Sequence, residues 1–338
     1  MPWRRASPSK ICDIAIFYLY LPNKTEAIMS DIKLNFLQRV ALELLWGFSR
    51  FMHAMPRWVR FGLFQNFIYV VLRMVGYRRR VVLQNLQRSF PEKSSDEIDA
   101  IARKFYRFLA EIFVDTISLA GAKPSDKEQY IHWVNGEEHR ERTAGKNWIA
   151  MATHFGCWEY FLMWSWTSKS QCVGVYHPLK SKVFECYYRR LRNFAPNVKQ
   201  VPMKDTMRHY LRNADNGEGV LLGLISDQSP ELRADTVWYD FLGRKTAFVE
   251  GSEKIALKFH LPVYFCYTQR LRAGEYSIRF DEIYDGVEQV APGEITRRYV
   301  ERLEAMIKQE PELWLWSHNR WKHTPEKQAR RFGKSTLE

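Results

Sequence analysis

A histidine and a glutamate stand five positions apart in the segment NWIAMATHFGCWEYFLMWSW, which covers residues 147–166. A neutral imidazole can take a proton from a hydroxyl group, and a nearby carboxylate can fix its tautomer and stabilise the imidazolium that forms. We therefore predict that His154 is a general base and that Glu159 is its partner. The nucleophile would be a substrate hydroxyl that attacks a thioester, while helix N-terminal amides or an arginine hold the oxyanion.

The elements around this pair decide whether the two side chains can meet. The apolar run 148–152 predicts a buried strand, Phe155-Gly156 a turn, and the pattern from Cys157 onward a helix. Side chains five residues apart on one helix point about 140° apart. The pair can therefore meet only if His154 lies on the loop, where the free amides of the following helix could also bind a substrate.

Other interpretations of this segment remain open. An isolated H-x-x-x-x-E pair is easily matched by chance, and the histidine could simply pack at a turn. Cys157 could be a nucleophile activated by His154. A metal centre is not predicted, because neither H-E-x-x-H nor C-x-x-C accompanies the pair.

A group of cations follows the next predicted strand, in the segment YHPLKSKVFECYYRRLRNF. Arginine can clasp a phosphate group with two parallel hydrogen bonds. Such a run is also typical of a solvated helix face, but an α/β sheet gathers its sites at one edge, which favours binding. The predicted substrate-binding cations are Lys180, Arg189, Arg190 and Arg192.

A second polar pair, Asp227-Gln228, comes directly after the apolar strand predicted at 219–226. Residues in that position lie at the same edge of a parallel sheet as His154. Asp227 could position an arginine or the substrate, or could cap a loop. We include both residues among the predicted substrate-binding groups.

From Trp133 onward, strand and helix patterns alternate along the chain. This order predicts an α/β fold with a mixed, largely parallel sheet flanked by helices. The predicted strands are 148–152, 171–176, 219–226, 262–269 and 276–280, and the predicted helices are 157–166, 181–193, 204–213, 247–259 and 294–308. Before them, residues 77–120 read as two helices separated by 90–96, with Ser95 as the N-cap of the second.

Residues 34–75 are apolar, but charged and amide side chains interrupt every window long enough to span a bilayer. The pattern predicts two or three amphipathic helices broken near Pro56, which could lie in an anionic membrane interface or form a core hairpin. The expected organisation is a possible upstream extension at 1–29, membrane-associating helices at 30–76, a catalytic domain at 77–325 and a loose polar tail at 326–338.

The net charge of +13 and the pI near 9.5 imply an anionic partner. Basic residues among aromatic ones could stack on single-stranded bases. The 12 Trp and 17 Tyr instead favour a membrane surface, because amphipathic rings prefer the headgroup level. We therefore expect an anionic membrane surface as a partner, and no nucleic acid.

The sequence resembles the lipid A late acyltransferases, the lauroyl and myristoyl transferases of bacteria, from about residue 36 to residue 325. Thr153 before the histidine and Glu159 at the end of the box favour this branch over the glycerophospholipid acyltransferases, which usually carry Asn and Asp there. Six short motifs occur in the same order along the chain as in the family. They are Asn85-Leu86 through Phe90-Pro91-Glu92; THFGCWE; Tyr176 to Lys180 with Arg189 to Arg192; Asp227-Gln228; Phe241-Leu242-Gly243; and Trp316, His318, Arg320, Trp321 and Lys322.

The resemblance implies a glycerolipid acyltransferase-like fold and an enzyme that moves a fatty acyl group from an acyl-carrier-protein or acyl-CoA thioester to a hydroxyl of a phosphorylated lipid A precursor. It implies no cofactor beyond that co-substrate, and a peripheral or monotopic location at the cytoplasmic face of the bacterial inner membrane. Acylation of another lipid alcohol, such as a lysophospholipid or an aminolipid, is the alternative within enzymes. A non-catalytic basic membrane-binding protein is the alternative outside them.

Overall fold

The computed structural model describes residues 32–193 and 197–333. In this part of the chain, seven strands form one sheet in the order β1-β9-β8-β2-β5-β3-β4, and two more form a small hairpin. The sheet contains β1 (Ile131–Trp133), β2 (Trp148–Ala152), β3 (Gln171–Tyr176), β4 (Val198–Pro202), β5 (Val220–Ile225), β8 (Val263–Arg272) and β9 (Glu275–Tyr284); the hairpin is β6 (Trp238–Phe241) with β7 (Arg244–Ala247).

The predicted mixed, largely parallel sheet is confirmed. Within the seven-stranded sheet only β8 and β9 pair antiparallel, and β2, β3, β4 and β5 all run in one direction. The carboxyl ends of these four strands therefore share one edge, where ligands of α/β sheets bind. The sequence did not predict β1, β4, β6 or β7. β4 is an edge strand that contains Lys199, Gln200 and Pro202, so it lacks an apolar run.

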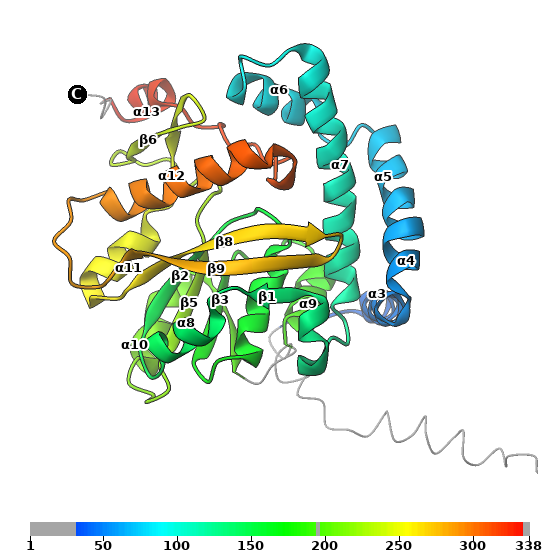
Figure 1. The fold of residues 1–338 in the computed structure, drawn as a ribbon, viewed down its shortest axis with the longest axis horizontal. Coiled ribbons are helices and arrows are strands. Elements are labelled where there is room, and N and C mark those ends of the chain that lie inside the picture. Colours follow the sequence, from blue (N-terminus) through cyan, green and yellow to red (C-terminus); the bar gives the residue numbers. More distant parts are fainter. Residues whose placement is uncertain (1–31, 194–196, 334–338) are drawn as a thin grey trace, which may run out of the picture.

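Helices cover both faces of the sheet (Figure 1). On one face, Tyr299 of α12 packs against Phe265 of β8, with ring centroids 5.6 Å apart. On the other face, the ring of His139 in α8 packs edge-on against the ring of Tyr264 in β8, with centroids 4.5 Å apart. The helices around the sheet are α8 (Gly136–Thr143), the 3-10 helix η3 (Trp158–Trp166), α9 (Lys182–Leu191), α10 (Thr206–Asn213), α11 (Gly251–Phe259) and α12 (Glu294–Gln309). Short 3-10 turns are η2 (Pro124–Gln129), η4 (Met203–Asp205) and η5 (Pro311–Leu313).

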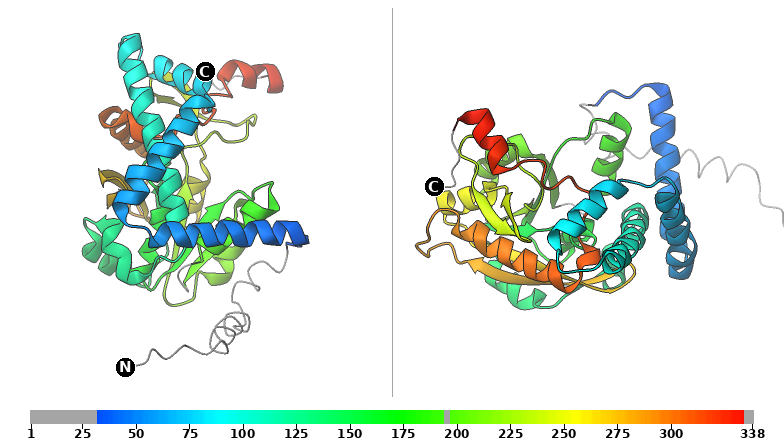
Figure 2. Two further views of the ribbon diagram at one scale, coloured as in Figure 1. Left: turned by 90° about the vertical axis from the view of Figure 1, so that its right-hand side faces the viewer. Right: turned by 90° about the horizontal axis from the view of Figure 1, so that it is seen from above.

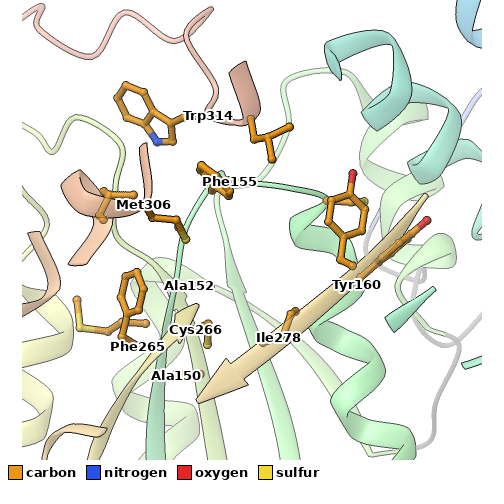
Figure 3. Close-up of a cluster of buried hydrophobic side chains, with 14 of the residues drawn as sticks. Ala150, Ala152, Phe155, Tyr160, Phe265, Cys266, Ile278, Met306 and Trp314 are labelled. Carbon is orange, nitrogen blue, oxygen red and sulfur yellow. The ribbon is translucent and has the colours of Figure 1, made fainter. Parts of the chain in front are cut away.

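A buried aromatic pair closes the end of β2. Phe155 and Trp314 lie beside each other there, joined by an antiparallel backbone bridge (Figure 3). The backbone amide of Gly156 also donates to the carbonyl of Leu313 at 3.1 Å. The C-terminal segment after α12 is thus attached to the loop that follows β2, which is the loop that carries His154.

The N-terminal helices lie along one side of the molecule (Figure 2). They are α3 (Phe36–Ala54), α4 (Arg57–Val59), the π-helical turn η1 (Arg60–Phe64) and α5 (Gln65–Met74), so the predicted break near Pro56 is confirmed. Large apolar side chains on them remain exposed, among them Phe36 (77%), Trp58 (75%) and Met74 (81%). No helix among the described residues is both long and apolar enough to cross a membrane. The extension proposed for residues 1–29 lies outside the described residues.

The two predicted helices after this region are α6 (Arg79–Ser89) and α7 (Ser95–Ser118). The predicted N-cap was wrong by one residue, because Ser94 accepts the amide of Glu97 and completes a capping box. On α6, the side chain of Asn85 donates to the carbonyls of Trp316 and His318, at 2.9 and 3.0 Å. The resemblance phrase around Asn85 therefore attaches α6 to the closing segment that carries Trp314.

The expectation of a loose polar tail at 326–338 was wrong for its first part. Residues Pro325–Phe332 form a helix, α13, whose Gln328 is fully buried. The Gln328 amide donates to the carbonyls of Arg233 and Ala234, and its oxygen accepts from the indole of Trp238. Hydrogen bonds from Gln328 to backbone carbonyls that are distant in the sequence keep this helix in place, and no local sequence pattern indicates these bonds.

Candidate active site

His154 lies on the loop between β2 and η3, as the sequence required. Its ring does not meet Glu159. Its Nδ1 is 2.6 Å from Oδ1 of Asp227, and its backbone amide donates to Oδ2 of the same carboxylate at 2.8 Å. β2 and β5 are neighbours, with Ala152 level with Ile225, so the residues that follow the two strands come together. The partner predicted for His154 was therefore wrong: the adjacent carboxylate is Asp227.

The other ring nitrogen, Nε2, faces a pocket at the carboxyl edge of the sheet. A carboxylate can only accept a hydrogen bond, so Nδ1 of His154 carries a hydrogen, and in the neutral form of the ring Nε2 presents a lone pair. The side-chain amide of Gln228 lies 3.0 Å from Nε2 and can donate to it. Trp158 packs edge-on against the imidazole, with centroids 4.8 Å apart. The ring is thus oriented with its basic nitrogen toward the substrate side.

Asp227 is held as an anion inside the protein, with a side chain only 1% exposed. The indole of Trp314 donates to its Oδ2 at 2.8 Å, in addition to the bonds from His154. Burial alone raises the pKa of this carboxyl, but the charge of His154 and these hydrogen bonds outweigh burial and leave the pKa below its usual value. Asp227 therefore stays ionised and can stabilise a positive charge on His154.

Glu159 instead pairs with Arg192. The guanidinium Nε donates to Oε2 at 2.7 Å and Nη2 donates to Oε1 at 2.5 Å, which is a two-pronged contact. Burial lowers the pKa of Arg192, but the carboxylate raises it above its ordinary value. Glu159 is buried at the start of η3 and still lines the pocket. The H-x-x-x-x-E spacing thus places both residues in the site, with different partners.

The predicted cations separate into two groups. Arg189 and Arg192 line the pocket, and Arg189 pairs with Glu185 at 2.8 Å. Arg190 points elsewhere: it pairs with Glu43 of α3 at 2.8 Å, and its guanidinium lies 4.2 Å from the ring centroid of Trp46. Lys180 is exposed on the loop after β3 and does not line the pocket. The structure thus keeps two of the four cations at the site.

A pocket of about 780 Å³ opens beside His154 at the carboxyl edge of the sheet. This volume lies within the range that small-molecule sites occupy. Both polar and apolar side chains line it, so it can hold a ligand with both kinds of group. The polar lining residues include His154, Glu159, Arg189, Arg192, Gln228 and Arg233, and the apolar ones include Phe161, Leu162, Val175, Ile225, Val237 and Phe248.

Cys157 does not have the properties of a nucleophile. It is 3% exposed, and burial followed by the nearby carboxylates of Asp115 and Glu159 raises the pKa of its thiol well above the usual value. A neutral buried thiol is inert. The alternative that His154 activates Cys157 therefore lacks support.

The sequence did not predict that Trp314, Trp158 and Arg233 belong to the candidate site. Trp314 binds Asp227, Trp158 contacts His154, and Arg233 lines the pocket. Trp158 is within the segment singled out at the start, so its position could have been inferred. Trp314 stands 87 residues from Asp227 along the chain, and no local pattern indicates that they meet. The segment around Trp314 belongs to the core: Trp316 and Arg320 are buried, and Arg320 donates to the carbonyl of Ala247 at 2.6 Å.

An imidazole that a buried carboxylate orients, with its other nitrogen toward a pocket, can remove a proton from a bound hydroxyl. The sequence profile of the bacterial lipid A biosynthesis acyltransferases matches residues 29–323. A search of curated proteins finds no sequence that matches this chain. The family match covers most of the chain, including every strand and the whole pocket. The chain therefore belongs to the bacterial lipid A biosynthesis acyltransferase family, whose members are acyltransferases for lipid A-type substrates.

Proposed function

We propose that this protein transfers a fatty acyl chain from an acyl-carrier-protein or acyl-CoA thioester to a hydroxyl of a phosphorylated lipid A precursor. His154 is the general base in this proposal, and Asp227 is the carboxylate that orients it. The observation that supports it most directly is the contact between the carboxylate of Asp227 and Nδ1 of His154, while Nε2 of the same ring faces the pocket.

The reaction follows from that line. The acceptor hydroxyl takes the place of the Gln228 amide at Nε2 of His154 and gives its proton to that nitrogen. Its oxygen attacks the thioester carbonyl and forms the new C–O bond. The C–S bond then breaks, and the imidazolium returns the proton to the departing thiolate. Asp227 stabilises the positive charge that His154 carries between the two proton transfers.

The charged rim of the pocket suits a phosphorylated acceptor. Arg189 and Arg192 already pair with carboxylates at the pocket. Arg233 is exposed and lines the same pocket. We therefore assign the main phosphate contact to Arg233.

The N-terminal helices provide the membrane contact in this proposal. We call their exposed apolar residues together the apolar surface, and basic residues such as Arg50, Arg73 and Arg79 lie on the same helices or just after them. Apolar side chains with adjacent cations are typical of proteins that lie in an anionic interface. The cytoplasmic face of the inner membrane, where acyl thioesters are available, is the proposed location. The apolar surface contains Phe36, Leu37, Val40, Leu44, Phe48, Phe51, Trp58, Leu63, Phe67, Val70, Val71, Met74 and Val75.

The substitution Phe67→Asp should weaken binding to anionic phospholipid vesicles by roughly 10- to 100-fold, because burying one large apolar side chain contributes about 1.5–3 kcal/mol. Phe67 is 64% exposed, so the change should leave the fold intact. The matched control is Val287→Asp, at a residue 73% exposed outside this surface. Vesicle sedimentation measures both. Equal binding of the two variants would place the membrane contact elsewhere.

Mass spectrometry of lipids tests the proposed function. In a strain that lacks the protein, one lipid A species should lose a secondary acyl chain, and the wild-type protein should restore it. The His154→Ala form should not restore it, provided that it accumulates to the same level. If lipid A is unchanged while another lipid class loses an acyl group, the acceptor assignment is wrong.

A further inference from the structure

Two glycines lie side by side in the middle of the sheet. Gly174 of β3 and Gly223 of β5 are partners in the parallel register, and Ala150 of β2 is level with Gly223. Partners in register point to the same face. A glycine inside a strand weakens it, and it often marks a place where another group approaches the backbone closely. Three very small residues in one row therefore need an explanation.

This row lies under the pocket. Both glycines line it and are partly accessible, although they sit at the centre of the sheet. Leu162 of η3 packs on Gly174, because a methyl group built there would lie 3.2 Å from Cδ2 of Leu162. A methyl group built on Gly223 would meet only the carbonyl oxygen of Val173, at 3.3 Å, so the open space of this row lies over Gly223 and is bounded by Leu162. We call Gly174 and Gly223 the glycine floor.

The space beside the glycine floor is closed by the next set of residues in register on the same face of the strands. On the same face, Cys172 is level with Leu221, which is level with Trp148, and all three are buried and outside the pocket lining. This row lies two residues along the strands from the glycine floor, which is a distance of about 6.6 Å. At the other end, Ile225 and Ala152 lead to His154. The path is therefore open beside the base and closed at its far end.

We propose that the glycine floor holds one fatty acyl chain of the reacting lipids and that it sets the chain length that the enzyme accepts. This inference rests on the proposed acyl transfer. A linear hydrocarbon chain fits a narrow apolar path that is closed at one end; a side chain added at Gly223 would fill the path, and one added at Gly174 would push Leu162. The buried row at Cys172 is the stop against which the terminal methyl lies.

The test is acyl transfer by purified protein with a series of acyl-CoA donors from octanoyl to hexadecanoyl. Gly223→Val adds an isopropyl group, three carbon atoms, with a residue type that strands favour. It should lower kcat/KM for the longest accepted donor relative to the shortest on the order of 10- to 200-fold, since one methylene in an apolar pocket has an effect of that size. Gly174→Ala should act in the same direction. Leu162→Ala widens the path and should shift the preference toward longer chains.

Leu224→Val is the matched control, because its neighbours in β5 show that this residue faces the opposite side of the sheet and it does not line the pocket. It should change thermal stability without changing chain-length preference. If Gly223→Val instead alters only the dependence on the acyl chains of the acceptor lipid, the chain on the floor belongs to the acceptor. If both glycine variants reduce transfer from every donor and to every acceptor by one common factor, the inference is wrong while the proposed function stands. If the wild-type protein transfers no acyl group, both are wrong.

Discussion

Replacing Asp227 by asparagine should reduce kcat by roughly 10³- to 10⁴-fold. The asparagine amide can donate a hydrogen to Nδ1 of His154, and the proton of the neutral ring then moves to Nε2. That nitrogen can no longer accept the proton of the hydroxyl. The amide oxygen can still accept the backbone amide of His154, which keeps the loop in place. Steady-state kinetics on purified protein, with circular dichroism as the folding check, measures the loss.

The matched comparison is His154→Ala, which removes the base itself. We expect a loss of about the same size, on the order of 10²- to 10⁴-fold. The double variant should be scarcely worse than either single one, because residues that act as a unit give non-additive losses. If Asp227→Asn kept most activity while Glu159→Gln lost it, the partner of His154 would be Glu159, and the observed carboxylate contact would not describe the working enzyme.

Replacing Glu159 by alanine should lower the free energy of unfolding by roughly 3 kcal/mol. This change leaves the guanidinium of Arg192 without its carboxylate in a largely buried place. Arg192 keeps some contact with water, since 22% of its side chain is exposed, so we expect the lower end of the range of roughly 3–5 kcal/mol for broken buried pairs. Denaturant unfolding measures the change.

The double substitution Glu159→Leu with Arg192→Met separates a structural role from a catalytic one. It replaces both charges by apolar groups of similar size, and it should recover most of the lost stability. If stability returns but the KM for the phosphorylated acceptor stays high, Arg192 contacts the substrate. A Glu159→Ala variant as stable as the wild type would contradict the importance of the ion pair.

Much of the fold follows from local patterns. The strand predicted at 148–152 has those bounds in the structure, because an apolar run ends there at a polar residue and a turn. The break near Pro56 also follows from local chemistry, since proline removes a backbone donor. The positions of His154 and Asp227-Gln228 at strand ends followed from the α/β order, so the sequence could predict which residues reach the site.

The sequence could not predict how those residues pair. Asp227 rather than Glu159 contacts His154 because β5 lies next to β2, and strand order is not encoded in any local run. Arg190 and Arg192 stand two positions apart on α9 and its end, yet one contacts α3 and the other the pocket. Such a division depends on which neighbours the folded chain supplies.

The end of α9 joins two surfaces mechanically. Arg190 is attached to Glu43 and Trp46 of α3, the hydroxyl of Tyr187 on the same helix lies 2.8 Å from that of Ser49, and Arg192 forms part of the pocket wall. A displacement of α3 against the sheet must either break the contacts with α9 or move α9 and Arg192 with it. Under the proposed membrane contact, a change in the depth of α3 in the lipid layer should therefore either break these contacts or change the width of the pocket.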